Sequence, residues 1–114
     1  MADGKPLQGL LVVDISQGIA GPTCGQLFAE HGARVIKVEP PEGDWIRKLG
    51  VPIEGNSAPA IVYNRGKESV ALDLKAPDAI AAVLRLASNA HVFLESGRPG
   101  AAERLGLGFE AVRK

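Results

Sequence analysis

The sequence predicts an α/β fold: a Rossmann-like parallel β-sheet with helices on both faces, present here as an incomplete portion. Three observations predict it. An apolar run, 10–13, leads into a turn of small residues and then into a helical stretch. A β-branched strand follows, so that strand, helix and second strand fit within about thirty residues, as in a βαβ unit. Hydrophobic residues make up 46% of the chain but aromatic residues only 4%, which favours an aliphatic core with Ala-rich helices.

The first half of the chain supplies two adjacent strands. Residues 10–15 form a continuous apolar strand that only Asp14 interrupts, as expected for a central parallel strand. Pro22 suits the first position of the following helix, because its missing N–H is not needed there, and Gly32 ends that helix. Residues 33–39 (ARVIKVE) form the second strand. A right-handed crossover places this strand parallel to the first.

The second half supplies two further strands after a long connection. Residues 40–59 are rich in Pro and Gly and lack periodicity, which indicates a loop. Beyond it we expect a third strand over 69–74, a helix that begins at Pro77 and a fourth strand over 91–95. Shorter helical segments are expected at 58–63, 101–105 and 109–114. Across the sheet the strands should lie in the order third, second, first, fourth.

The charge composition argues against several classes of partner. Thirteen basic and thirteen acidic residues give a net charge of zero, which favours neither nucleic acid nor a membrane surface. No apolar run approaches the ~18 residues that span a bilayer. Cys24 is the single cysteine, so an internal disulfide is excluded and a reducing, cytoplasmic location is expected. His31 and His91 show no ligand spacing, and we expect no metal.

The glycine-rich turn within 14–25 indicates a nucleotide phosphate site. In parallel α/β sheets such turns lead into a helix N-terminus, where free N–H groups and the helix dipole attract anions. Glu39 lies 18 positions after Gly21, near the ~20 expected for a carboxylate that binds a ribose. However, the glycines are spaced G-x-x-G-x-x-x-G in place of G-x-G-x-x-G. Two interpretations remain: a site for a dinucleotide such as NAD, or glycines that only permit close helix–strand packing.

Several other reactive side chains have structural interpretations. Asp14 and Asp73 are expected to accept hydrogen bonds from backbone N–H groups of nearby turns, with Lys75 as a surface partner of Asp73. Cys24 is expected to be a small buried hydrophobe. Trp45 either covers a ligand or packs the long loop against the domain.

Four stretches of the chain form one ordered set of motifs. They are PLQGLLVVD (6–14), DISQGIAGPTCGQLFAEHGARVIKVEPPEGD (14–44), NRGKESVALDLKAP (64–77) and ESGRPGAAERLGLGFE (95–110). In this order and at this spacing they resemble the N-terminal part of the family III CoA-transferases. That group includes carnitine and formyl-CoA transferases and the α-methylacyl-CoA racemases. The resemblance extends from Pro6 to Lys114.

The resemblance implies an enzyme that moves CoA between an acyl-CoA thioester and a small carboxylic acid. In this family an aspartate nucleophile forms acyl-anhydride and aspartyl-CoA intermediates, the large domain binds CoA, and two subunits interlock as rings. No covalently bound cofactor is implied. The CoA contacts that the resemblance implies fall on loops at strand ends: Ile19 and Ala20; Leu72, Asp73, Leu74 and Lys75; Ser96, Gly97 and Arg98; and Arg104.

Two positions depart from the family's pattern. Pro40 stands where some formyl-CoA transferases carry a basic CoA contact, and Ser96-Gly97 stands where many members have Asn and an aromatic residue. The family's catalytic aspartate lies beyond residue 114, so we expect residues 1–114 to be a single CoA-binding segment with no catalytic residue, inactive alone. Three functions remain open: half of such an enzyme, a stand-alone NAD-type module, or a non-catalytic interaction domain. Under each, a homo-oligomer such as a dimer is expected to cover the apolar faces.

Overall fold

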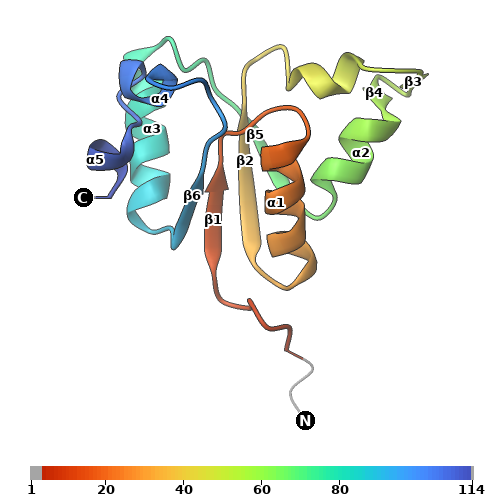
Figure 1. The fold of residues 1–114 in the computed structure, drawn as a ribbon, viewed down its shortest axis with the longest axis horizontal. Helices are drawn as coiled ribbons and strands as arrows, with labels where there is room; N and C mark the ends of the chain where they lie inside the picture. Colours follow the sequence, from red (N-terminus) through yellow and green to blue (C-terminus); the bar gives the residue numbers. More distant parts are fainter. Residues whose placement is uncertain (1–3, 114) are drawn as a thin grey trace.

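The computed structural model describes residues 4–113 and contains a four-stranded parallel sheet. Its strands are β1 (Leu11–Asp14), β2 (Arg34–Glu39), β5 (Glu68–Ala71) and β6 (Val92–Leu94), in the order β5-β2-β1-β6. This is the predicted order third, second, first, fourth. The carboxyl ends of all four strands meet at one end of the sheet, opposite the N-terminus of the chain (Figure 1).

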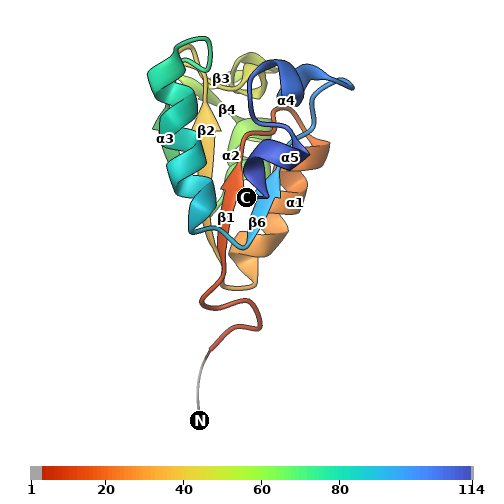
Figure 2. The same ribbon diagram turned by 90° about the vertical axis from the view of Figure 1, so that its left-hand side faces the viewer.

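Helices cover both faces of the sheet, which confirms the predicted α/β fold. They are α1 (Ala20–Glu30), α2 (Ala58–Asn64), α3 (Pro77–Ser88), α4 (Ala101–Arg104) and α5 (Phe109–Val112). Figure 2 shows α1 and α3 on opposite sides of the strands. Helix α2 contacts α1, and α5 contacts α3, so each face has its own group of helices.

The hydrophobic core consists of two clusters, one on each face of the sheet. Adjacent residues of β1 point to opposite faces, as the pleat requires. Val13 packs with Val38, Val83 and Leu107 on the α3 face. Val12 packs with Ala33 and Val35 on the α1 face. Because both faces of β1 are covered, its apolar run is continuous instead of alternating.

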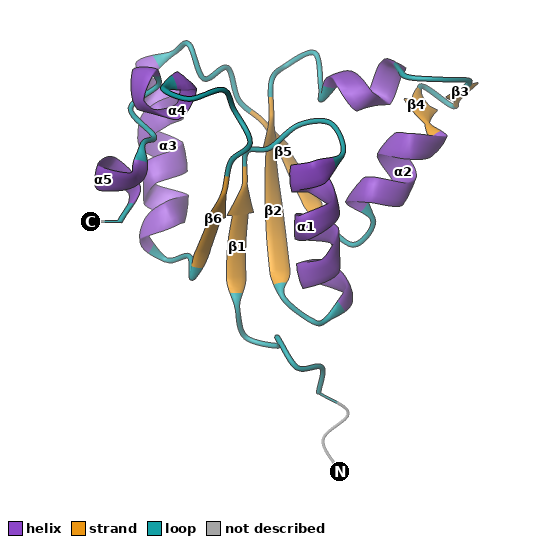
Figure 3. Ribbon diagram, viewed as in Figure 1, coloured by secondary structure: helices purple, strands orange, loops and turns teal. Residues whose placement is uncertain are grey.

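Residues 40–59 are more ordered than the sequence predicts. A 3-10 helix, η1 (Trp45–Lys48), is followed by a hairpin of two short strands, β3 (Pro52–Ile53) and β4 (Asn56–Ser57). The hairpin lies apart from the main sheet, beside α2 (Figure 3). Tertiary contacts stabilise this segment: Ile46 is fully buried, and the Ser57 hydroxyl donates to the Ile46 carbonyl at 2.6 Å.

The structure also corrects element boundaries. Helix α1 begins at Ala20, so Pro22 is the third helical residue and not the first. A proline at the third helical position also removes no hydrogen bond, because the first N–H groups of a helix have no partner within it. Strand β5 ends at Ala71, before residues 72–74, which were expected to continue it. Gly32 adopts φ +106° after α1, as its predicted role in ending the helix requires.

Candidate functional site

The structure brings the segments of the expected CoA site to one end of the sheet. The β1–α1 turn, the loop after β5 and the loop after β6 all leave the carboxyl ends of neighbouring strands, and α4 lies at the same end (Figure 1). In parallel α/β sheets this end is where ligands bind. Every segment named from the sequence therefore lies at this end of the sheet.

The β1–α1 turn exposes the start of a helix. Gly18 has φ +86° and is buried, while Ile19 and Ala20 are exposed. Ile19, the residue that precedes α1, makes no side-chain hydrogen bond to the helix, and the first turn of α1 contains no acidic residue. The first N–H groups of α1 therefore have no capping side chain and can face an anion.

Two charged side chains hold this turn from beneath. Lys37 on β2 and Asp44, just before η1, form an ion pair of 2.9 Å and are both essentially buried. Asp44 accepts the Gly18 N–H at 3.1 and 3.2 Å with its two oxygens, and the Ile46 N–H at 3.0 Å. Lys37 donates to the Ser16 carbonyl at 2.9 Å. The conformation of the turn is thus fixed by partners more than twenty residues away.

A second buried ion pair lies under α1. The Lys67 Nζ is 2.9 Å from an Asp14 oxygen and also donates to the Pro22 carbonyl and the Asn64 side chain. Burial lowers the pKa of Lys67, and the charge of Asp14 opposes that shift. The other oxygen of Asp14 accepts the backbone N–H of Ser16 at 2.9 Å. The expected backbone role of Asp14 is confirmed, while its pairing with Lys67 was not predicted.

Glu39, at the end of β2, is fully engaged. Arg47 donates to both of its oxygens at 2.6 and 2.7 Å, and the Asp44 N–H and the Ser69 hydroxyl also donate to it. Burial alone would raise the pKa of Glu39, but the hydrogen bonds from Arg47, Ser69 and Asp44 lower it to about 2. With both oxygens in use, this carboxylate is poorly placed to bind a ribose.

The loop after β5 borders a pocket of about 350 Å³. Asp73, Leu74 and Lys75 line it together with Gln17 and Glu42. Leu72 does not line the pocket: its side chain packs against the core, as that of Leu74 also does, and its N–H donates to the Glu39 carbonyl. The pocket carries two carboxylates and one ammonium group, so it suits a neutral or mixed ligand surface better than a phosphate.

Within that loop the expected partner of Asp73 is corrected. An Asp73 oxygen accepts the backbone N–H of Lys75 at 3.0 Å, as expected for a carboxylate in a turn. The Lys75 ammonium group forms no ion pair with any carboxylate among residues 4–113. Both side chains are exposed, and the Lys75 charge is available to a ligand.

The loop after β6 lies against the start of α1. A Cβ atom at Gly21 would come within 3.3 Å of the Ser96 Cβ, so the two segments are in contact. Gly97 donates its N–H to Glu95 at 2.8 Å. Arg98 and Arg104 are exposed, and neither has an ion-pair partner in the part of the chain that the structure describes. Two free guanidinium groups thus lie at the same end of the sheet as the α1 N-terminus.

The sequence profile described as CoA-transferase family III matches residues 7–114. The chain belongs to this family. Among its relatives are the "Probable fatty acyl-CoA transferase Rv3272" of Mycobacterium tuberculosis, 45% identical over 112 residues, and the "Succinyl-CoA--D-citramalate CoA-transferase" of Chloroflexus aurantiacus, 43% identical over 110 residues. These matches cover 96% and 95% of this chain but 28% and 27% of the relatives. The chain therefore spans about a quarter of the length of such family III proteins.

Solved structures of family III proteins share the fold. A crystal structure of Rv3272 superposes with a TM-score of 0.89 at 44% identity, over 96% of this chain and 30% of that one. A CAIB/BAIF family protein from Brucella suis gives a TM-score of 0.91 at 37% identity, over 97% of this chain and 31% of that one. The parallel sheet and its helices are thus the fold of this part of the family.

Sequence reasoning missed the buried residues that shape this family III site, namely Lys37, Asp44 and Lys67. One signal was available: Lys37 lies within the β-branched run 33–39, which the predicted strand order places between two other strands. A buried ammonium group needs a carboxylate partner. The sequence could not say which carboxylate this is, because Asp44 lies within the connection 40–59, for which the sequence predicts no regular structure.

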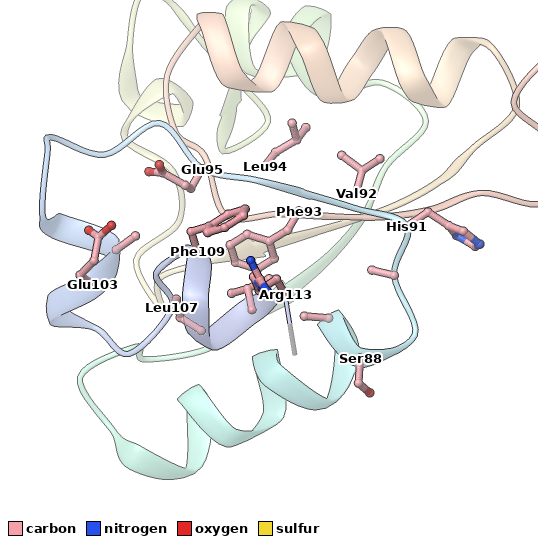
Figure 4. Close-up of a pocket in the computed structure, with 14 residues that line it drawn as sticks. Ser88, His91, Val92, Phe93, Leu94, Glu95, Glu103, Leu107, Phe109 and Arg113 are labelled. Carbon is pink, nitrogen blue, oxygen red and sulfur yellow. The ribbon is translucent and has the colours of Figure 1, made fainter.

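A second pocket, of about 660 Å³, was not predicted at all. It lies beside the exposed edge of β6, and its lining includes Phe93, Leu107 and Phe109 (Figure 4). The Arg113 guanidinium lies 5.5 Å from the centre of the Phe109 ring. None of the residues expected to contact CoA lines this pocket.

The structure also places Cys24 and Trp45. Cys24 is half-buried and free, so it is less buried than predicted. Trp45 is 52% exposed, with its ring against Gly18, so it does pack the connection onto the β1–α1 turn. Among residues 4–113, no group of three His, Cys, Asp or Glu side chains could hold a metal ion. Within the same residues, no helix has the length and apolar character to cross a bilayer.

Proposed function

We propose that this chain binds coenzyme A at the carboxyl end of its sheet and serves the transfer of CoA between an acyl-CoA thioester and a small carboxylic acid. The observation that carries the proposal is the convergence of three loops and α4 at one end of the sheet, where α1 begins without a cap. Relatives whose names state such reactions, with succinate or oxalate as the acid, support the reaction class.

Two regions of the proposed site differ in charge and suit different parts of CoA. The diphosphate and 3′-phosphate of CoA are anionic and suit Arg98, Arg104 and the free N–H groups of α1, because guanidinium groups and helix N-termini both bind phosphate. The pocket of about 350 Å³ beside Asp73 and Glu42 suits an uncharged part of the molecule. The ligand would therefore extend across the sheet end, from the loop after β6 to the loop after β5.

The aspartates that the structure describes support a binding role more than a covalent one. Asp14 and Asp44 are buried in ion pairs, and Asp73 is engaged by a backbone N–H. Asp78 lies in the first turn of α3. A nucleophilic carboxylate must reach the thioester carbon, and the buried Asp14 and Asp44 cannot do so while keeping their ion-pair partners. The family resemblance also places the catalytic aspartate beyond residue 114, so that it is none of these four. We therefore assign no catalytic residue to this segment, and we expect it to be inactive alone.

A second candidate is an interaction domain, which a patch of exposed apolar side chains favours. Those side chains lie on η1, the loop after it, β3 and α2: Trp45, Leu49, Val51, Ile53, Ile61 and Val62. Apolar surface concentrated in this way is typical of protein interfaces. A homodimer that covers this patch is compatible with CoA binding at the sheet end. Light scattering across micromolar concentrations tests it, and a constant monomer mass would contradict it.

Calorimetric titration of the chain with CoA and, in parallel, with NAD tests the proposal. We expect saturable CoA binding, no NAD binding, and a loss of CoA affinity of roughly tenfold or more in Arg104→Ala. The matched control is Arg34→Ala, which removes the same charge from an exposed arginine paired with Glu68 at the amino end of β2. It should bind CoA like the unmodified chain. Absence of CoA binding at millimolar concentration, or equal binding of NAD, would overturn the proposal.

A further inference from the structure

The buried pair Lys37–Asp44 has an unusual set of partners. Among residues 4–113, the two side chains bond to each other and otherwise only to backbone groups: Lys37 to the Ser16 carbonyl, and Asp44 to the N–H groups of Gly18 and Ile46. Two of these three backbone groups belong to the turn between β1 and α1. The pair thus binds one short turn at two points, the carbonyl of Ser16 and the N–H of Gly18, which are two residues apart.

These contacts determine which way the turn faces. The Gly18 N–H points inward to Asp44, and the positive φ of Gly18 then directs the chain outward. Ile19 and Ala20, the next two residues, are exposed at the sheet end. The Trp45 ring closes the turn from the side, because a Cβ at Gly18 would come within 2.5 Å of its Cζ2. One conformation of the turn satisfies all of these contacts.

A buried ion pair is a weak source of net stability, because the desolvation of both charges offsets their attraction. Its main effect is to favour one conformation of the backbone groups that it binds, and not to raise the free energy of unfolding. Here the conformation selected is that of a turn at the proposed ligand site. A turn already fixed before binding spares the entropy of ordering it when the ligand arrives.

We propose that Lys37 and Asp44 are positioning residues for coenzyme A: they hold the β1–α1 turn so that Ile19, Ala20 and the free N–H groups of α1 face the ligand. Neither side chain touches the ligand, because both are buried. This inference rests on the proposed function. It adds that CoA affinity depends on two charges that lie outside the contact surface.

Three variants separate positioning from stability. Asp44→Asn keeps an oxygen that can accept the N–H groups of Ile46 and Gly18, as one Asp44 oxygen does at 3.0 and 3.1 Å. Its NH2 group, however, cannot accept from Lys37 and cannot make the second contact with the Gly18 N–H, so Lys37 is left as an unpaired buried charge. Lys37→Met removes the bond to Ser16 and leaves Asp44 as an unpaired buried charge. The double variant removes both charges, so that no buried charge is left uncompensated.

The experiment measures three quantities for each variant of the full chain: the melting temperature, the CoA dissociation constant, and deuterium exchange of the peptide spanning 16–21. We expect each single variant to weaken CoA binding by roughly tenfold and to speed exchange of this peptide. The double variant should recover melting temperature relative to Lys37→Met while CoA binding stays as weak as in the weaker single variant. A purely structural role would make affinity recover together with melting temperature.

The control is Val35→Ala, a buried change near the amino end of β2, remote from the turn. It should lower the melting temperature and leave CoA affinity within about twofold of the original value. If Lys37→Met fails to fold, Gly18→Ala displaces the same turn from the Trp45 side and should weaken CoA binding similarly.

The outcomes distinguish this inference from the proposed function. Unchanged CoA affinity in folded Asp44→Asn, or an affinity that follows melting temperature across all variants, would overturn the positioning role. Absence of CoA binding by the original chain would instead overturn the proposed function, and with it the positioning role for CoA. In that case faster exchange of peptide 16–21 in Asp44→Asn would still show that the pair fixes the turn.

Discussion

Replacing Lys67 with Met should destabilise the protein severely, although Lys67 lies in a turn near the surface. The Lys67 side chain is 2% exposed and makes three hydrogen bonds, to Asp14, Pro22 and Asn64, at 2.8–2.9 Å. Met fills a similar volume but donates none of them. Asp14 is left fully buried with donors from Ser16 alone. Breaking a buried pair in this way costs about 3–5 kcal/mol, a large part of the ~5–15 kcal/mol that stabilises a typical domain.

Urea unfolding followed by circular dichroism measures this loss. With a slope of about 2 kcal/mol per molar urea, the midpoint should fall by about 2 M. The matched control is Arg34→Met, which breaks the Arg34–Glu68 pair of 2.7 Å. That pair is exposed on both sides, so the midpoint should not change measurably. A loss below about 1 kcal/mol in Lys67→Met would show that the Asp14–Lys67 pair is hydrated in solution, and would refute the reasoning from burial.

Three further changes test the same polar network. The pKa of Glu39 is about 2 when folded and 4.5 ordinarily, so its pairing with Arg47 stabilises the protein above pH 4.5. This contribution is on the order of 2 kcal/mol after allowance for the partial exposure of Arg47. It should vanish in Glu39→Gln, and the unmodified protein should lose it as the pH falls towards 2. Urea midpoints measured across this pH range test both expectations. Gly25→Ala should cost about 1–3 kcal/mol despite the better helix propensity of Ala, because its Cβ would lie 2.6 Å from an Asp14 oxygen; thermal melting measures this. In Asp14→Asn, Lys67 loses the negative charge that opposes the lowering of its pKa, so the pKa of Lys67 in the folded state should fall further. The folded state then binds fewer protons than the unfolded state, and the stability of this variant should rise with pH towards 10.5 more steeply than that of the unmodified protein. Thermal melting between pH 7 and pH 10 measures this difference.

The sheet could be predicted because its signals are local. Each strand is a short apolar run bounded by Gly, Pro or Asn, and right-handed crossovers restrict the order in which such strands can pair. The predicted order therefore agrees with β5-β2-β1-β6. Asp14 was also predictable as an acceptor for its own turn, because its partner Ser16 is two residues away. The end of the sheet at which we propose the site follows from the same topology.

The structure of residues 44–57 could not be predicted, because its stabilising contacts are distant in sequence. The short helix η1 is held by Ile46 in the interior and by the bond from Ser57, and neither produces a periodic pattern. The two ion pairs join residues that are far apart: Asp14 and Lys67 are separated by 53 positions. Single-sequence patterns report on contacts within about one helical turn or one strand, so such partners cannot be assigned from them.

The location of the buried ion pairs indicates why the fold contains them. The two hydrophobic clusters pack on the two faces of the sheet. The pairs Lys37–Asp44, Asp14–Lys67 and Arg47–Glu39 lie instead at the carboxyl ends of β1 and β2. If these pairs served stability alone, apolar side chains of equal volume would serve at least as well at the same positions. Apolar side chains could not, however, satisfy the buried Gly18 N–H and Ser16 carbonyl, which follow directly from a turn that exposes the start of α1. The Lys37–Asp44 pair is therefore the consequence of a turn that leaves the N-terminus of α1 open at the sheet end.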